Sequence, residues 1–316
     1  MRLLAPASTS FFLSIHLKVM LSVVSLLAWI CFMQSSSDLL MAGVVVVSGA
    51  IVTGLSNFYH ILEKRDWSPF LLVWWTSGAM IGTHTFQEGS LSLLAYALAL
   101  LCFMACYSRE KAPVAIFNMC VALTVGAMCF PPMLFLLPLS LFGLTKISPI
   151  TIQKLLASFV GILMPFWFMF AYTLLSDDCT FFMDFASQVR QIHFFDYTSI
   201  PMEQVVTFAT TTLWMGFFVA IHIKSVHSFQ LHTRLVFTCL AFFFVYIVAL
   251  VVALPQHLSE FVLMEIVTGT LFVAYFVTHQ EAVSPRLAMI INTLVFFVVL
   301  AVNVWKNLST LGAIWD

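Results

Sequence analysis

The sequence predicts an all-α protein: a polytopic transmembrane bundle of about eleven helices that occupies residues 1–316 as a single domain. Of the 316 residues, 62% are hydrophobic and only 9% are charged, whereas about a quarter of the residues in a soluble domain are charged. At roughly 20 apolar residues per crossing, little of the chain is left for a soluble domain. The long apolar runs do not alternate as the strands of a membrane barrel do. Helices are therefore expected, since each satisfies its own backbone hydrogen bonds.

Eleven apolar runs, separated by polar clusters, predict the helices in chain order. The first run follows a basic residue but has no cleavage site of small residues at its end, so we expect it to remain as the first crossing. The predicted helices are Leu17 to Met33, Leu39 to Asn57, Phe70 to Phe86, Ser90 to Tyr107, Val114 to Phe130, Met133 to Leu144, Ile152 to Leu175, Gln204 to Ile223, Leu235 to Leu254, Leu258 to Val277, and Arg286 to Trp305.

The fifth and sixth helices are short for a crossing, and Pro131 and Pro132 lie at the turn between them. At about 1.5 Å per residue, neither one comfortably spans a core of ~30 Å. Either the turn is submerged among other helices, or the pair from Val114 to Leu144 is a re-entrant hairpin and ten helices cross. Pro165 is expected to kink the seventh helix.

The distribution of Lys and Arg predicts a cytoplasmic N-terminus. Basic residues accumulate on the inner side of membrane proteins, and this orientation places eleven of the thirteen there, with Arg190 and Lys306 outside. The inner residues are Arg2, Lys18, Lys64, Arg65, Arg109, Lys111, Lys146, Lys154, Lys224, Arg234 and Arg286.

The longest polar segment, residues 176–203, is expected on the outer side. Phe181, Phe185, Val189, Ile192 and Phe195 recur there at helical spacing, which predicts an amphipathic helix in the outer interface. The simpler interpretation is a structural collar. The functional interpretation is a lid over an outer cavity, in which Arg190 could bind a phosphate or carboxylate.

Ionisable residues inside crossings are costly and indicate functional sites. Glu265, seven residues into the tenth predicted helix, is the clearest case and is a candidate for binding or catalysis. Further candidates for one outer polar pocket are His84, His257, Glu260, Asp38 and Glu88, although each is also explained as a solvated or hydrogen-bonded residue at a helix end.

No cofactor or metal site is expected. Three of the nine histidines, His222, His227 and His232, are spaced by five residues, which does not place them on one helix face. No motif of the common soluble enzymes is present. The net charge of −1 also argues against nucleic acid as a partner.

Two stretches carry a family resemblance. SREKAPVAIFNMCVALTVGAMCFPPMLFLLPLSLFGL with KLLASFVGILMPFWFMFAYTLL, and the later HLSEFVLMEIVTGTLFVAYF, resemble an uncharacterised family of polytopic inner-membrane proteins from Bacteroidota. Some members carry a carotene-oxygenase label, which the histidine spacing here does not support. The central stretch also looks distantly like the GT-C membrane glycosyltransferases, and that resemblance implies a catalytic acid in the first outer loop, where Asp38 is the one candidate.

The expected function is that of a non-catalytic component of the bacterial inner membrane and cell envelope. Such a protein would be a complex subunit or would handle lipid-like molecules, with the bilayer, envelope proteins and a lipid or lipid-linked ligand as partners. A GT-C-like glycosyltransferase that uses a polyprenyl-phosphate-linked sugar is the first alternative. A proton-coupled transporter that depends on Glu265 is the second.

Overall fold

A computed structural model of the chain describes residues 7–33, 35–59, 61–62, 66–80, 83–106, 112–147, 151–176, 180–197, 200, 202–225, 231–278 and 285–315. In these ranges all regular secondary structure is helical, which confirms the predicted fold class at that level. The predicted basic residues Arg2, Lys64, Arg65, Arg109 and Lys111, together with His227, lie outside the described residues.

Twelve α-helices lie in the described ranges, with short 3₁₀ helices at three of the connections. In chain order they are α1 (Ala7–Phe32), α2 (Asp38–Phe58), α3 (Ser68–Ala79), η2 (Glu88–Leu91), α4 (Ser92–Ala105), α5 (Ala112–Cys129), η3 (Pro131–Phe135), α6 (Leu136–Ile147), α7 (Ile152–Ser176), α8 (Thr180–Arg190), α9 (Met202–Ser225), α10 (Leu231–Ala253), η5 (Pro255–His257), α11 (Leu258–Thr278) and α12 (Pro285–Trp315).

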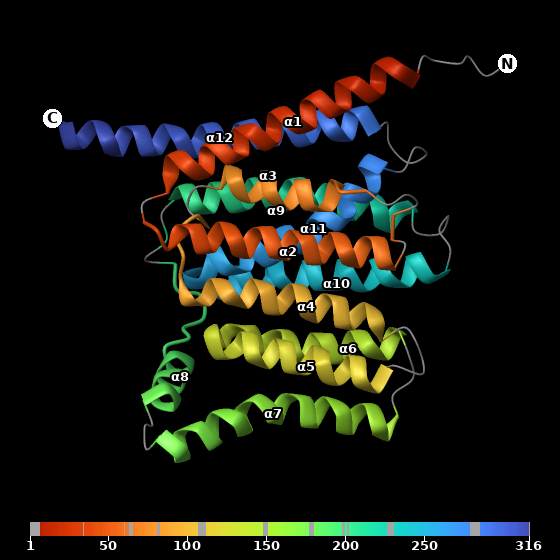
Figure 1. The fold of residues 1–316 in the computed structure, drawn as a ribbon, viewed down its shortest axis with the longest axis vertical. Helices are drawn as coiled ribbons and strands as arrows, with labels where there is room; N and C mark the ends of the chain where they lie inside the picture. The colour runs from red at the N-terminus through yellow and green to blue at the C-terminus, as the bar shows by residue number, and fades with distance from the viewer. Residues whose placement is uncertain are drawn as a thin grey trace.

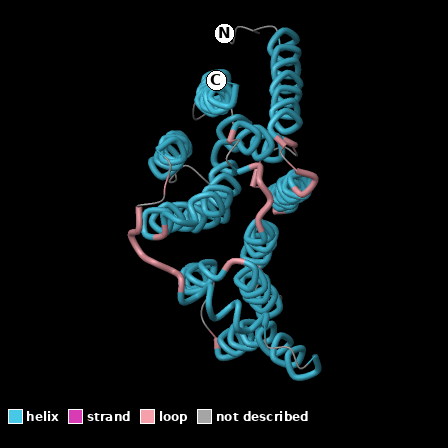
Figure 2. The backbone as a smooth tube through the Cα atoms, turned by 90° about the vertical axis from the view of Figure 1, so that its left-hand side faces the viewer, coloured by secondary structure: helices cyan, strands magenta, loops and turns pink. Residues whose placement is uncertain are grey.

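The helices other than α8 run side by side along one direction, and α8 lies at the end of the bundle where α7 finishes (Figure 1). Seen along the bundle, most helices appear end on (Figure 2). In the described residues, six helices are long and apolar enough to cross a membrane: α2, α5, α7, α9, α10 and α11. We call the end that holds α8 and the start of α2 the α8 end, and the other the opposite end.

The most buried helix is α11, which packs against α2, α3, α4, α9, α10 and α12. Every residue from Phe261 to Phe276 is buried. A helix that is buried on all sides belongs to the centre of a bundle. Any polar side chain on α11 is therefore held inside protein rather than at a surface.

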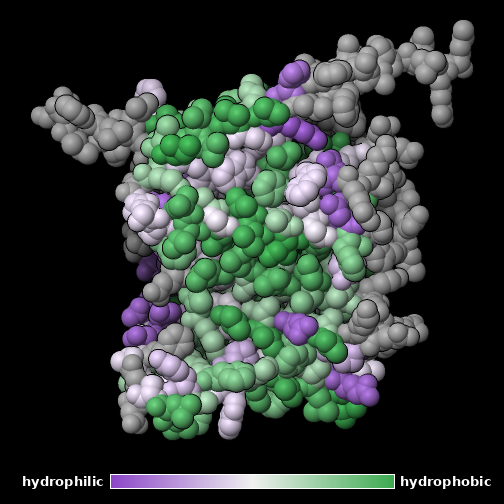
Figure 3. Space-filling model, in the orientation of Figure 1, coloured by the Kyte–Doolittle hydropathy of each residue, from purple (hydrophilic) through white to green (hydrophobic). Residues whose placement is uncertain are grey.

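The peripheral helix α7 shows the contrasting pattern. Its buried residues form a single stripe with spacings of three and four, namely Ser158, Gly161, Pro165, Met169 and Thr173. This stripe faces α5, the helix against which α7 chiefly packs. The remaining faces of α7 carry exposed large apolar side chains, Trp167 among them. In the space-filling view, apolar residues occupy the middle of the visible face and polar residues gather toward the two ends (Figure 3).

Several predicted helix bounds differ from the structure; the first helix, for example, begins at Ala7 and not at Leu17. The helix predicted from Phe70 to Phe86 ends at Ala79; the Thr83 hydroxyl and backbone N–H both donate to the Met80 carbonyl, which holds a turn in place of further helix. The helix in the polar segment 176–203 ends at Arg190, so Phe195 lies beyond it with a positive φ of 61°. The last helix continues to Trp315, ten residues past the predicted end.

The turn between α5 and α6 is enclosed by protein. Pro131, Pro132 and Met133 are buried within η3, and Phe130 packs edge-on against Phe261 of α11 with ring centroids 5.3 Å apart. Both interpretations of this helix pair, a turn submerged among other helices and a re-entrant hairpin, require such cover. Non-helical backbone is tolerated at membrane depth only where protein shields it.

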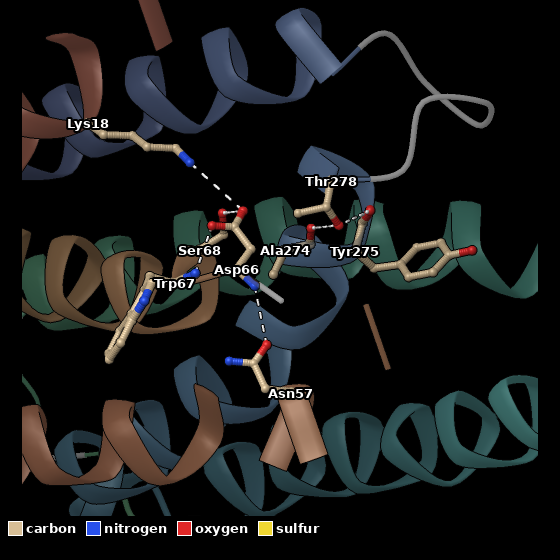
Figure 4. A network of polar contacts seen from close by, with 8 residues as sticks. All are labelled: Lys18, Asn57, Asp66, Trp67, Ser68, Ala274, Tyr275 and Thr278. Atoms are coloured by element: carbon tan, nitrogen blue, oxygen red, sulfur yellow. Dashed lines mark hydrogen bonds and ion pairs between the residues drawn. The ribbon is translucent and has the colours of Figure 1, made fainter. Parts of the chain in front are cut away.

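Asp66 joins three helices at the opposite end (Figure 4). Its carboxylate accepts hydrogen bonds from the Trp67 N–H, at 2.7 Å, and from the Ser68 hydroxyl, at 2.5 Å. These bonds hold Asp66 against the first residues at the start of α3. The Asp66 N–H donates to Asn57 of α2, and Lys18 of α1 lies 3.9 Å from the carboxylate. The network orders this end and includes none of the candidate site residues.

Candidate functional site

The structure places the candidate residues in three different settings. A polar cluster lies at the α8 end, around the start of α2, the connection from α3 to η2, and the start of α11. A buried carboxylic acid, Glu265, lies deeper in α11. An apolar groove lies on the outside of the bundle between α5 and α7.

Asp38 and His84 both lie in the polar cluster, where the Asp38 carboxylate acts electrostatically on the imidazole. Asp38 is the first residue of α2, and its carboxylate accepts hydrogen bonds from the backbone N–H groups of Ser35, at 3.0 Å, and Phe86, at 3.2 Å. Its side chain is 4% exposed. The carboxylate therefore holds two connections together and presents little surface to a substrate.

His84 follows the end of α3 and is almost fully buried. Its ring stacks on Trp29 of α1 with centroids 3.8 Å apart, and its Nε2 lies 3.2 Å from the Ser77 carbonyl. Burial lowers the pKa of His84 to about 4, although the Ser77 carbonyl and the nearby Asp38 carboxylate oppose the shift. The imidazole is thus neutral near pH 7, and Nε2 carries the hydrogen that it donates.

Glu260 lies across the cluster from this connection. It is in the first turn of α11, and a Cβ built on Gly89 of η2 would lie 3.5 Å from its Oε1. The Ser259 hydroxyl donates to Oε2 at 2.9 Å. The carboxylate is thus directed toward η2, where it borders a small cavity. The other lining residues are Thr83, Thr85, Gln87, Ser90, Ser259 and Leu263.

Two other candidates lie at the same end but in different surroundings. His257 is in η5 and packs edge-on against Phe130, with centroids 5.1 Å apart. Arg190 ends α8, which packs against α7 and η3, and its side chain is exposed. Glu88 is in η2, but its side chain lies outside the described part of the chain. Asp38, His84 and Glu260 thus lie at the same end of the bundle, but of the three only Glu260 lines the small cavity, and Arg190 lies on a separate helix.

Glu265 does not line this cavity. It lies five residues after Glu260, about 7.5 Å farther along the helix axis, and is fully buried. In the described residues neither carboxyl oxygen has a hydrogen-bond partner, although the Thr212 hydroxyl of α9 is a neighbour that acts on the carboxyl group. Nearby on α11, the Thr268 hydroxyl donates to the Met264 carbonyl. The Thr268 hydroxyl oxygen therefore accepts a hydrogen bond from the Tyr96 hydroxyl of α4, which lies 2.6 Å away.

The groove between α5 and α7 has a volume of about 610 Å³. Ligand sites in proteins typically have volumes of about 300–1,000 Å³. Its lining is apolar except for the hydroxyl of Tyr172 and consists of Val121, Val125, Met128, Met164, Pro165, Phe168, Met169 and Tyr172.

Gly161 and Pro165 explain why the groove forms. A Cβ at Gly161 would lie 2.7 Å from the Phe117 carbonyl oxygen, so the two helix backbones touch there because the glycine has no side chain. One turn later, Pro165 cannot donate a backbone hydrogen bond to the Gly161 carbonyl, and such a position bends a helix. The sequence drew attention to the proline but not to the groove; a glycine four residues before a proline is the signal that could have indicated it.

Comparisons of the chain with protein-family models, with curated proteins and with solved structures give no match.

Proposed function

We propose that this chain is a multi-pass protein of the bacterial inner membrane that handles a lipid-like molecule without chemical conversion. The observation that carries the proposal is the apolar groove between α5 and α7. It is large enough for a ligand, it lies on a helix whose other faces are apolar and exposed, and no catalytic group lines it.

We further infer that the N-terminus is cytoplasmic. Lys146, Lys154, Lys224 and Arg234 lie at helix ends that the ribbon places together at the opposite end (Figure 1). Arg190 is on α8 at the other end. Basic residues concentrate on the cytoplasmic side of membrane proteins, which supports an outward-facing α8 end. Eleven crossings follow if every helix except α8 spans the bilayer.

The occupant that fits the groove is a single acyl or isoprenoid chain. The lining extends from Val121 to Met128 along α5 and from Met164 to Tyr172 along α7, which is about 10–12 Å of helix length. A sugar or a nucleotide would leave its polar groups unpaired against this lining, at a cost of several kcal/mol. Methionine, which supplies three of the lining residues, adapts to irregular apolar shapes.

Photo-crosslinking tests the proposal. The purified protein in nanodiscs is exposed to a phospholipid that carries a diazirine in its acyl chain, and separately to a polyprenyl phosphate with the same group. Crosslinks are mapped by peptide mass spectrometry. We expect labels to concentrate on the α5 and α7 residues that line the groove, for one of the two probes more than for the other.

A matched pair of variants distinguishes the groove from the general lipid surface. Val125→Trp fills the groove, whereas Val160→Trp adds the same side chain to an exposed face of α7 outside it; the two valines are 46% and 51% exposed. Val125→Trp should reduce the groove labels at least five-fold, and Val160→Trp should leave them unchanged. Labels spread evenly over all exposed faces in both variants would indicate ordinary surrounding lipid and refute the proposal.

Glu265 favours a second candidate function, proton-coupled transport. A fully buried carboxylic acid in the middle of a helix, with the Thr212 hydroxyl as its polar neighbour, is costly, and such groups mark ion or proton pathways in membrane proteins. Uptake into proteoliposomes under an imposed proton gradient tests it. Substrate uptake that is lost in Glu265→Gln supports transport, and uptake that is unchanged in this variant counts against it.

A further inference from the structure

We propose that one ordered water molecule occupies a small cavity between α3, α9 and α12, where it joins the indole N–H of Trp214 to acceptors on the two other helices. The cavity lies between the end of α3, the middle of α9 and the first half of α12. The groove that carries the proposed function lies on α5 and α7, so this site is tested independently of that function.

The observation that points to a ligand is the side chain of Trp214. It lines the cavity and is only 6% exposed, and its Nε1 has no hydrogen-bond partner in the described part of the chain. Buried polar groups are nearly always bonded to protein or to ordered water. Trp75, which lines the same cavity, shows the usual arrangement, because its Nε1 donates to the Ser22 hydroxyl of α1 at 3.0 Å. The Trp214 N–H therefore requires an acceptor that the cavity can hold.

The side chains opposite Trp214 offer acceptors. The Thr76 hydroxyl donates its hydrogen to the Leu72 carbonyl at 2.7 Å, and the Thr211 hydroxyl donates to the Thr207 carbonyl at 2.9 Å. Both oxygens keep only lone pairs for the cavity. Asn292 of α12, which is 3% exposed, also lines it and adds an amide with both a donor and an acceptor.

The end of α3 adds backbone acceptors beside the cavity. In a continued α-helix, the N–H groups of Met80 and Thr83 would donate to the carbonyls of Thr76 and Ala79. Here the Met80 N–H donates to Ser77 and the Thr83 N–H donates to Met80. Thr76 and Ala79 both line the cavity. The last carbonyls of a buried helix need partners from outside the helix, and a water molecule can supply the hydrogens.

The size and the chemistry of the cavity select water over other ligands. Its volume is about 10 Å³, which is close to the minimum that holds a single water molecule, so a sugar or a phosphate does not fit. An N–H donor directed at a cation is unfavourable, and hydroxyls that have already donated their hydrogens cannot stabilise an anion. A water molecule is both an acceptor for the Trp214 N–H and a donor to the surrounding oxygens.

NMR on the unmodified protein tests the site. The chain is labelled with ¹⁵N-tryptophan in nanodiscs, and Trp214→Phe identifies the indole signal of Trp214 by its loss. We expect a cross peak between this indole proton and water in a ROESY spectrum, with the sign of a bound water rather than of chemical exchange. The absence of that cross peak in the unmodified protein would overturn the proposal, whatever the variants do.

A matched pair of variants connects the water to the cavity. Val299 lines the cavity and is 4% exposed, so Val299→Ile adds a methyl group where the water would lie. Val298→Ile makes the same change on a 53% exposed face of the same helix. The water cross peak of Trp214 should be lost in Val299→Ile and retained in Val298→Ile. A cross peak that persists in Val299→Ile would show that the water lies elsewhere and would also overturn the proposal.

Thermal unfolding in detergent tests whether the water bonds to Trp214. Displacing the water leaves a buried donor unpaired, so Val299→Ile should lower Tm by about 2–4 °C. In a Trp214→Phe protein no N–H is left unpaired, and adding Val299→Ile should lower Tm by less than half as much. Equal decreases in the two backgrounds would mean that Trp214 and the water are not coupled, which contradicts the proposed bridge.

Discussion

The imidazole of His84 stacks on the indole of Trp29, with ring centroids 3.8 Å apart and an interplanar angle of 17°. The contact joins α1 to the non-helical connection that follows α3. It buries a titratable group in a position where only its neutral form is well accommodated. The stability of the α8 end should therefore respond to pH.

Stability is expected to fall as the pH decreases from about 6.5 toward 4. The pKa of His84 is lowered to about 4 by burial, whereas an unfolded histidine has a pKa of about 6.5. Between these values the unfolded chain binds more protons, so acid favours unfolding, and the contribution is complete only above the unfolded pKa. Tm measured from pH 7.5 to 4.5 should decrease less steeply in His84→Gln. The matched change at an exposed histidine, His193→Gln, should leave the slope unchanged; equal slopes in all three proteins would contradict the prediction.

Asp38 is expected to behave as a structural residue. Asp38→Ala removes the acceptor of two backbone hydrogen bonds and should lower the free energy of unfolding by about 2 kcal/mol. Asp38→Asn keeps one side-chain carbonyl oxygen as an acceptor and should lower the free energy of unfolding by a smaller amount. Urea or thermal unfolding in detergent measures both. Sugar transfer from a polyprenyl-phosphate donor that is lost in a well-folded Asp38→Asn protein would instead establish the glycosyltransferase alternative.

Cysteine labelling should separate the two ends of the bundle. With a cytoplasmic N-terminus, an impermeant maleimide applied to intact cells should label Asp184→Cys and not Lys146→Cys or Lys224→Cys. Inverted vesicles should show the reverse. The parent chain, with its seven cysteines, sets the background. Labelling of Lys146→Cys and Asp184→Cys from the same side would show that the orientation is wrong.

The contact between α5 and α7 should depend on Gly161. In Gly161→Ala the new Cβ would lie 2.7 Å from the Phe117 carbonyl oxygen and 2.9 Å from Cys120 Cβ, so α7 must shift. We expect a loss of about 1–3 kcal/mol in the free energy of unfolding and altered lipid labelling in the groove. Gly43→Ala in α2 is the matched control, because nothing lies within 4 Å of its Cβ. That change should be neutral or should stabilise the helix by up to about 1 kcal/mol.

Glu265 should be destabilising in its present environment. Glu265→Met replaces a buried group that lacks hydrogen bonds with an apolar side chain of similar length, which should raise the free energy of unfolding by about 1–3 kcal/mol. Thermal unfolding measures the effect. A gain in stability indicates that the carboxyl group is retained for function. A large loss would mean that Glu265 is satisfied by a partner, such as Thr212, and would remove the reason to regard it as functional.

The sequence by itself determined the existence and order of the helices. Each predicted helix overlaps one in the structure, because a run of about 20 apolar residues and hydrogen bonds within one segment are local properties. The candidates Asp38, His84 and Glu260 were also found in the sequence, since polar residues at the ends of apolar runs are conspicuous. The end of α3 at Ala79 could not be predicted from the sequence, because a turn that buried contacts stabilise does not change the hydropathy of the segment.

Only the tertiary structure decided which faces are buried and which polar groups meet. Helices α7 and α11 are both strongly apolar, yet α11 is buried on all sides and α7 along one stripe. Hydropathy cannot separate these cases, because lipid tails are as apolar as the leucines of a neighbouring helix. The groove beside Pro165, the cavity at Glu260 and the position of Glu265 opposite Thr212 all arise from contacts between distant segments, which no local pattern in the chain encodes.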